Sequence, residues 1–373
     1  MDNKKIKVAI VINDFLVGGA QKLIADMVTR FDKDRFEIVL VTLFLFEKKE
    51  SLYRLLPSQT SLHKLTFSSF SDIRSWFALI SVLRAERPDV VVSNLFFSNT
   101  IMRILKLIVG YECITVEHNT YIHKTKLQIF CDRLLAKLTY AIVAVSSSAR
   151  KFTSSQEKIP LSKFRVIYNG IDIDAIEEML AIYDKKKLME ELGLSPNRRY
   201  IVDVARIVSQ KNHALLLEGF SRFAKTHSEY DLLIVGGGGL QETLMNQTRK
   251  LDLEHKVHFF GNQRDVFRFY YLSEFFVSTS TIEGFGLAHV EALACGLPLV
   301  STKTAGPDEM IDEGKNGFFI KEETADGVAT ALGRMNDAHP HSMREASRQT
   351  ASHFDIRETV RAYEALIEES MMR

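Results

Sequence analysis

Two carboxylates separated by seven residues, Glu283 and Glu291, mark the segment of this sequence best suited to binding chemistry. Glu283 follows an apolar strand pattern in a loop that contains glycine, and Glu291 lies inside the apolar helical pattern that comes next. A carboxylate buried without a partner is costly, so Glu291 requires hydrogen-bond donors. The two hydroxyls of a ribose would supply them, and a structural salt bridge is the alternative explanation.

Basic side chains follow two other strand patterns. Arg206 comes directly after the pattern at 200–205, and Lys211 opens the next helix. Two cations at such a junction can hold both phosphates of a departing nucleoside diphosphate, although a solvated basic loop would have the same sequence. His118 follows the pattern at 114–117 and could donate to a substrate hydroxyl or help to stabilise a developing positive centre. A satisfied structural hydrogen bond is the competing interpretation of His118.

Glycines stand beyond two further strand patterns. Gly18 and Gly19 precede a helical pattern, and a run of four glycines at 236–239 ends a later strand pattern. Glycine lets the backbone approach a phosphate closely and a helix N-terminus offers free N–H groups, but a tight turn needs the same residue. The spacing is not G-x-G-x-x-G, and no acidic residue in a ribose-binding context follows, which argues against a nicotinamide-dependent oxidoreductase.

The sequence contains one apparent metal motif. Asp172-Ile173-Asp174 matches the D-x-D of metal-dependent transferases, but it follows Asn169-Gly170, and we expect it to cap a helix. No H-E-x-x-H, paired C-x-x-C or comparable set of ligands is present. We therefore expect no metal ion and no other cofactor, with phosphate charge met by arginine, lysine and backbone N–H groups.

These residues all follow strand patterns, and strand patterns alternate with helical patterns along the whole chain. Such alternation predicts parallel sheets covered by helices, whose ligands bind beyond the carboxyl ends of the strands. A polar stretch at 176–199 divides the patterns into two series. We expect an N-terminal Rossmann-like domain at 1–180, a second Rossmann-like domain at 181–355, and a final helix at 356–373 that packs back toward the first domain. The expected strands are 8–12, 38–43, 90–93, 114–117, 142–145 and 165–167 in the first series, and 200–205, 232–235, 257–260, 276–278, 299–301 and 318–320 in the second.

Charge is unevenly distributed, although the net charge is only +1. Residues 1–170 contain 25 Lys and Arg against 15 Asp and Glu, and residues 51–170 contain 16 against 7. This excess, beside the apolar and basic stretches 96–109 and 124–138, suggests contact with an anionic bilayer; core helices with snorkelling lysines are the alternative. No stretch reaches the roughly 18 apolar residues of a membrane span, and three separate cysteines are typical of reduced thiols. We expect a cytoplasmic protein that can associate with the inner face of the plasma membrane and has no nucleic-acid partner.

Taken together, these segments resemble the GT4-type family of retaining glycosyltransferases, which has the GT-B fold of two Rossmann-like domains facing across a central cleft. Glu283 and Glu291 within EGFGLAHVE are similar to the family's E-x7-E motif, and the glycine, histidine and basic segments follow the family's order over nearly the whole chain. The chain departs from the family at Gln21, where an acid is common, and in its four consecutive glycines. Both departures concern the nucleotide and acceptor edges of the site.

The resemblance implies that the domain at 1–180 binds the acceptor and the domain at 181–355 binds the nucleotide-sugar donor. It also implies a role for each candidate residue. His118 would lie near the anomeric carbon, Glu283 would contact the transferred sugar, and Glu291 would bind the ribose. Arg206 and Lys211 would bind the donor pyrophosphate and complete the catalytic set with His118 and Glu283. The other donor-binding residues would be Gly18, Gly19, Gly236, Gly237, Gly238, Asn262, Arg264, Gly284, Phe285, Gly286 and Leu287.

The resemblance also implies an activity. We expect metal-independent, retaining transfer of a hexosyl or N-acetylhexosaminyl group from a nucleotide sugar, with UDP as the expected nucleotide. The expected acceptor is lipid-linked, or of the polysaccharide or lipopolysaccharide type, in bacterial surface glycan synthesis. A non-catalytic sugar-nucleotide-binding protein would keep the glycines and cations but would not need Glu283 together with His118. A nucleotide-sugar epimerase of the same GT-B architecture is the other alternative, and product analysis without acceptor would distinguish it.

Overall fold

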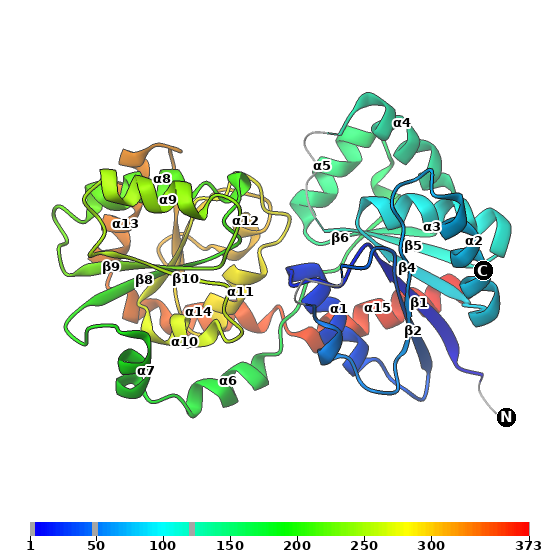
Figure 1. Cartoon of the computed structure of the whole chain (residues 1–373), viewed down its shortest axis with the longest axis horizontal. Coiled ribbons are helices and arrows are strands. Elements are labelled where there is room, and N and C mark those ends of the chain that lie inside the picture. Colours follow the sequence, from blue (N-terminus) through cyan, green and yellow to red (C-terminus); the bar gives the residue numbers. More distant parts are fainter. Residues whose placement is uncertain (1–3, 47–50, 119–123, 373) are drawn as a thin grey trace. The chain divides into compact units, whose positions relative to one another are not determined.

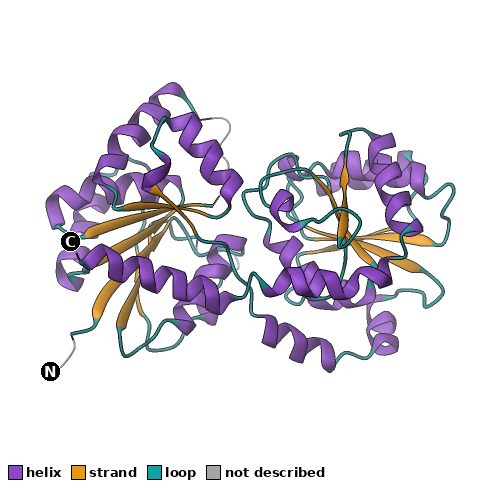
Figure 2. Ribbon diagram, turned by 180° about the vertical axis from the view of Figure 1, so that it is seen from behind, coloured by secondary structure: helices purple, strands orange, loops and turns teal. Residues whose placement is uncertain are grey.

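The computed structural model describes residues 4–46, 51–118 and 124–372, and the chain divides into two compact units. The first unit contains Met1–Gly170 together with Ile356–Arg373, and the second contains Ile171–Asp355. The chain therefore passes between the units twice. In each unit, strands form a sheet that has helices on both faces (Figure 1, Figure 2).

Seven parallel strands form the sheet of the first unit in the order β3-β2-β1-β4-β5-β6-β7. Runs of β-branched residues such as VVVSN in β4 explain these strands, because such side chains fit a pleated and buried surface. The strand order reverses between β1 and β4, which is where open α/β sheets bind ligands. The strands are β1 (Ile6–Ile12), β2 (Phe36–Thr42), β3 (Ser61–Lys64), β4 (Val90–Asn94), β5 (Glu112–Glu117), β6 (Ala141–Ala144) and β7 (Phe164–Val166).

Alternation along the strands assigns side chains to two faces of this sheet. Ala9 and Val11 pack in a core cluster with α2 and α3, whereas Ile10 and Leu23 line a small cavity with Tyr363 of α15. In Figure 1 the red α15 lies beside the blue α1, so the C-terminal helix completes one face of the first unit. The helices are α1 (Gly19–Arg30), α2 (Ile73–Glu86), α3 (Phe96–Val109), α4 (Lys126–Leu135), α5 (Ser147–Glu157) and α15 (Ile356–Met371).

Six parallel strands form the second sheet in the order β10-β9-β8-β11-β12-β13, which reverses between β8 and β11. Its core joins residues of β8 and β9 to α8 and α13. The strands are β8 (Arg199–Val204), β9 (Tyr230–Val235), β10 (Val257–Gly261), β11 (Phe275–Ser278), β12 (Leu299–Thr302) and β13 (Gly317–Ile320). The helices are α6 (Ile173–Ala181), α7 (Lys185–Leu192), α8 (His213–Phe223), α9 (Gln241–Lys250), α10 (Phe267–Leu272), α11 (Leu287–Ala294), α12 (Pro307–Met310), α13 (Ala325–Asp337) and α14 (Arg344–Ser352).

The twelve expected strands are all present with small shifts at their ends, and in the first unit a strand and a helix occur where none was expected. These are β3, a strand of four residues at the edge of its sheet, and the polar helix α5. The first crossing between units follows Gly170 rather than residue 180. The reason is that α6 packs on α10 and α11 of the second unit.

Candidate functional site

Two loops of the second unit are joined at the carboxyl edge of its sheet, where β8 and β11 end. The Gln210 side chain donates to the Ile282 carbonyl at 2.7 Å, and the Thr281 N–H donates to the Gln210 carbonyl at 2.9 Å. Thr279 Oγ1 donates to the Asn212 carbonyl at 3.0 Å. These bonds fix the loop that carries Lys211 against the loop that carries Glu283.

Lys211 and Glu283 form an ion pair, in which the lysine ammonium donates to Glu283 Oε1. Ser280 Oγ donates to the same oxygen at 3.1 Å, and the Glu283 side chain is buried. Arg206, by contrast, is exposed, and its guanidinium has no partner among the residues that the structure describes. The loop between β8 and α8 thus carries a cation without a partner in the described chain and, further along, an ammonium that a carboxylate orients, and both side chains are suited to a phosphate group.

Close approach of the backbone explains two of the glycines that follow β9. A Cβ at Gly236, where φ is 132°, would lie 2.0 Å from the Ala205 carbonyl oxygen, and a Cβ at Gly238 would lie 2.1 Å from that of Ile207. Both distances are far inside van der Waals contact. Gly236 and Gly238 therefore let this turn lie against the loop that carries Arg206.

The neighbouring turn after β10 contains two further candidates. Asn262 and Arg264 are both exposed at this edge of the sheet. A Cβ at Gly237 would lie 2.9 Å from Asn262 Oδ1, so the second glycine lies directly beside this amide. The turn after β9 and the turn after β10 thus form one continuous surface of the second unit.

Among residues 283–287, some side chains are buried in the core and do not reach the carboxyl edge of the sheet. The Phe285 ring packs edge-on against Phe354 with a centroid distance of 5.3 Å, so this side chain belongs to the core and only its backbone is available. Gly284 is also buried. Gly286 has a φ of 89° and precedes Leu287, the first residue of α11, so the backbone turns sharply into the helix there.

Glu291 is less buried than its apolar neighbours in α11. Val290, Leu293 and Ala294 lie in the core as expected, whereas Glu291 itself is half-buried. Its Oε2 accepts a hydrogen bond from Tyr270 at 3.1 Å. The buried carboxylate that the sequence suggested is therefore a partly accessible one with a tyrosine partner.

In the first unit, His118 follows β5 and is bonded to the end of β4. Its Nε2 lies 2.8 Å from Asn94 Oδ1, while Nδ1 is buried and has no partner among the described residues. Burial lowers the pKa of His118 to about 4, so the imidazole is neutral near pH 7. Gly18 and Gly19 lie at the start of α1, whose N-terminus has no side-chain cap and no acid in its first turn.

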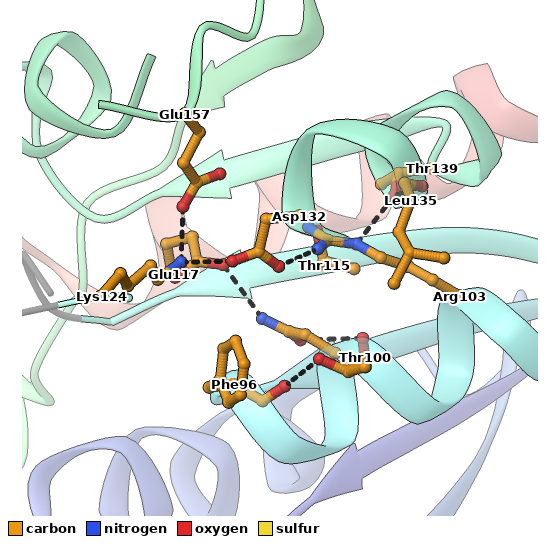
Figure 3. Close-up of polar contacts among 12 residues, drawn as sticks. Phe96, Thr100, Arg103, Thr115, Glu117, Lys124, Asp132, Leu135, Thr139 and Glu157 are labelled. Atoms are coloured by element: carbon orange, nitrogen blue, oxygen red, sulfur yellow. Dashed lines mark hydrogen bonds and ion pairs between the residues drawn. The ribbon is translucent and has the colours of Figure 1, made fainter. Parts of the chain in front are cut away.

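A buried cluster of charged side chains lies beside β5 (Figure 3). Lys124 donates to Asp132 at 2.8 Å and to Glu157, and Arg103 donates to Asp132 at 2.9 Å. Glu117, the residue before His118, accepts from Asn99 at 3.3 Å, and its second oxygen is buried without a hydrogen-bond partner in the described chain. Three carboxylates thus share two cations, and the cluster links β5 to α3, α4 and α5.

The excess of carboxylates over cations affects the pKa values of the acidic residues in the cluster. Burial, then the neighbouring Glu117 charge, raises the pKa of Glu157 to about 7. Burial also raises the pKa of Glu117. Burial alone would lower the pKa of Lys124, but the three carboxylates outweigh it and raise that pKa. The cluster therefore retains a proton on its carboxylates at mildly acidic pH, which lowers its negative charge.

A pocket of about 250 Å³ opens at the carboxyl ends of β1, β2 and β3. Phe15 and Tyr53 stack within it at a centroid distance of 5.3 Å, and Lys64 lies 4.0 Å above the Tyr53 ring. Asp14 lines the same pocket and accepts from Gln21 at 3.2 Å. Aromatic faces with a few charged groups are typical of small-molecule sites.

The structure thus gathers the candidate residues by unit, at the carboxyl edges of the two sheets. The second unit holds Arg206, Lys211, Gly236, Gly237, Gly238, Asn262, Arg264, Glu283, Gly284, Phe285, Gly286, Leu287 and Glu291, and the first holds Gly18, Gly19 and His118. Sequence patterns did not single out Asn94, Ser280 and Tyr270 as site residues, although these contact His118, Glu283 and Glu291. Asn94 could have been predicted as a site residue, because it is a polar residue at the end of the strand VVVSN.

Two further features bear on metal binding and membranes. Asp172 caps α6 by accepting from the Ala175 N–H at 3.2 Å, so the D-x-D sequence has the capping role that was predicted for it. Within residues 4–46, 51–118 and 124–372, no three His, Cys, Asp or Glu side chains are grouped as metal ligands would be. None of the helices in these ranges combines the length and the apolar character that crossing a bilayer requires.

Comparison with known proteins agrees with this architecture. Residues 184–350 match the family "Glycosyl transferases group 1" and residues 17–175 match "Glycosyltransferase Family 4". HepE from Anabaena, solved in complex with UDP, superposes with a TM-score of 0.81 at 19% identity and covers 98% of this chain and 100% of its own. The chain belongs to the GT4-type glycosyltransferase family and has the GT-B fold, as its sequence predicted.

Curated relatives give a finer comparison. The chain is 28% identical over 228 residues to N-acetyl-alpha-D-glucosaminyl L-malate synthase of Bacillus anthracis, an alignment of 60% of this chain and 58% of that protein. It is 24% identical over 356 residues to the UDP-Gal:alpha-D-GlcNAc-diphosphoundecaprenol alpha-1,3-galactosyltransferase of Escherichia coli, which covers 90% of this chain and 89% of that one. The chain thus spans less than two thirds of the first relative and most of the second.

Proposed function

We propose that this glycosyltransferase takes its sugar from a UDP-sugar, retains the anomeric configuration and needs no metal ion. This proposal is carried by the loop after β8, in which Arg206 is exposed and has no partner within the described ranges while Lys211 is paired with Glu283. Arg206 and Lys211 can both donate charge-assisted hydrogen bonds to a diphosphate without a metal ion. The donor printed in the name of the E. coli relative and the UDP bound to HepE support UDP as the nucleotide.

The reaction follows from where charge develops. The bond between the anomeric carbon and the diphosphate oxygen breaks, while an acceptor oxygen forms its bond to that carbon on the same face. The acceptor's proton passes to an oxygen of the departing diphosphate. Arg206 and Lys211 stabilise the growing negative charge, and Glu283 holds the Lys211 ammonium in place, as preorganised charges do in many enzymes.

The acceptor side of the proposal rests on the first unit. The pocket lined by Phe15, Tyr53 and Lys64 can pack the apolar face of an acceptor sugar against aromatic rings and place a cation beside an anionic group. On α4, Leu127, Phe130 and Leu134 are 71%, 62% and 53% exposed. Their spacing puts them on one helix face, and we propose that this face contacts an anionic bilayer from which a lipid-linked acceptor is taken.

Calorimetric titration with UDP, GDP and ADP in the presence of EDTA tests the donor half. We expect UDP to bind best, and Arg206→Ala to weaken it and to lower turnover by about 10²–10³, the usual cost of one charge-stabilising donor. Lys250→Ala, an exposed cation on α9, is the matched control and should change neither quantity. Preference for another nucleotide, dependence on added Mg²⁺, or normal turnover in Arg206→Ala would contradict the proposal.

Product analysis separates the alternative functions. Incubation of the wild-type protein with UDP-sugar alone should give at most slow hydrolysis, and addition of an acceptor should give a product whose anomeric configuration matches the donor. Interconversion of the sugar without acceptor would instead indicate an epimerase. Nucleotide-sugar binding without any turnover would indicate a binding protein.

A further inference from the structure

The position of His118 is set by the side chain of Asn94. Asn94 is the last residue of β4 and is 3% exposed, and its strand neighbour in β5 is Val116, two residues before His118. Side chains alternate between the faces of a sheet, so Asn94, Val116 and His118 share one face. The hydrogen bond of 2.8 Å between Asn94 Oδ1 and His118 Nε2 is the result.

Other contacts of Asn94 determine which atom of its amide faces the histidine. Its Nδ2 donates to the Val11 carbonyl at 3.2 Å and to the Val92 carbonyl at 3.3 Å. Carbonyl oxygens only accept hydrogen bonds, so they require the amide nitrogen on their side and leave Oδ1 toward His118. Because Oδ1 is also only an acceptor, the hydrogen of the imidazole must lie on Nε2.

The backbone of His118 is held from the opposite face. Glu117 points toward α3, where its carboxylate accepts from Asn99 at 3.3 Å, and Asn99 also donates to the Val116 carbonyl at 3.0 Å. The end of β5 is therefore fixed on both sides before any substrate binds. This leaves His118 Nδ1 with a lone pair that is buried and unmatched within the described residues.

We propose that Asn94 is a positioning residue that holds His118 as the neutral Nε2–H tautomer, so that its Nδ1 presents an acceptor to a substrate hydroxyl. The inference rests on the proposed glycosyl transfer, in which every substrate carries hydroxyl donors. It changes the role expected for His118. The imidazole accepts a hydrogen bond from the substrate, and it neither donates one nor carries a positive charge.

The tautomer can be read directly by NMR of the full-length protein labelled with ¹⁵N-histidine. His118→Gln identifies the His118 signals by their loss. In the wild-type protein at pH 7, we expect the Nε2 signal of a protonated nitrogen and the Nδ1 signal of an unprotonated one. A protonated Nδ1 in the wild-type protein would overturn the proposal without the need for any further variant.

Two substitutions of Asn94 then separate positioning from mere stability. Asn94→Leu removes the oxygen acceptor at similar volume, and we expect a mixture of tautomers and a kcat at least about tenfold lower, with the affinity for UDP unchanged because Arg206 and Lys211 belong to the other unit. Asn94→Asp keeps an oxygen in place and should keep the tautomer. A folded Asn94→Leu protein with the wild-type tautomer and kcat would overturn the proposal. The wild-type tautomer in a protein that transfers no sugar would refute only the proposed function.

Discussion

At the scale of single residues, the glycines after β9 look like a ligand-binding motif, but backbone packing within the protein explains part of the run. Gly238 has the Ile207 carbonyl where its Cβ would be, whereas Gly239 has no heavy atom within 4 Å of that position. Neither glycine has a positive φ, so the two differ in available space and not in conformation. They form a matched pair for substitution.

We predict that Gly238→Ala moves the loop carrying Arg206 and lowers the free energy of unfolding by about 1–3 kcal/mol, the usual cost of overpacking. Gly239→Ala should change it by less than about 0.5 kcal/mol. Urea unfolding of both variants measures this difference. Equal stabilities would mean that the turn relaxes freely and does not position Arg206.

Sequence patterns located the charged and glycine candidates at this scale but not their partners. Arg206, Lys211 and His118 each follow a strand pattern, and this alone places them at a carboxyl edge of a sheet. The bond between Asn94 and His118 joins residues 24 apart, and the Ser280 contact depends on how a loop folds. Such contacts depend on strand order and loop geometry, which periodicity does not contain.

At the scale of elements, α4 has an unusual distribution of side chains. Its buried face carries Asp132 inside the charge cluster, while apolar residues occupy its exposed face. The sequence left two interpretations of the apolar and basic stretch 124–138, bilayer contact or a core helix, because periodicity alone does not say which side an apolar face meets. Likewise, β3 reads SLHK and contains no β-branched residue, so its sequence does not indicate a strand, whereas other strands of four residues or fewer were recognised by their apolar runs.

The cluster gives the first unit a pH dependence with a definite sign. The Glu157 carboxyl keeps its proton to about pH 7 when folded, because burial and the Glu117 charge raise its pKa, and it titrates near the ordinary 4.5 when unfolded. Between these values the folded state binds more protons, so the free energy of unfolding falls as pH rises. The contribution is fully present below about pH 4.5 and is lost as pH passes about 7.

Glu157→Gln should remove this contribution while the amide oxygen still accepts from Lys124. We predict that the decline in unfolding free energy between pH 5 and 8 is smaller than in the wild-type protein by at least about 1 kcal/mol, since one pKa unit is about 1.4 kcal/mol. Urea unfolding across this pH range measures it. Asp34→Asn, an exposed acid of the same unit, should follow the wild-type curve. Parallel curves for Glu157→Gln and wild type would show that Glu157 is ionised throughout.

At the scale of the whole molecule, positive charge and exposed apolar side chains coincide in the first unit. The excess of 16 basic over 7 acidic residues in 51–170 includes Lys126, Arg133 and Lys137, which are exposed beside the apolar face of α4. The second unit carries the compensating negative charge. Such a division favours the first unit for contact with anionic lipid.

We predict that the wild-type protein co-sediments with vesicles that contain anionic lipid, and that salt weakens this binding. Leu127→Glu combined with Phe130→Glu should reduce the bound fraction at least about tenfold, because it replaces apolar contact with like-charge repulsion. Ile182→Glu is the matched control, since Ile182 is 81% exposed but lies in the second unit. Binding that is absent, or equal in all three proteins, would reject the membrane face.

The first unit is built from two segments of the chain, so it cannot be produced as one continuous N-terminal fragment. Helix α15 supplies the Glu364 carboxylate that accepts from the Asp32 N–H at 2.8 Å and the Thr359 hydroxyl that donates to the Tyr168 carbonyl at 2.9 Å. A polypeptide truncated after Gly170 would leave the apolar side of α1 bare, because the helix that covers it is synthesised only after the whole second unit. The first unit can therefore reach its finished form only after α15 has left the ribosome.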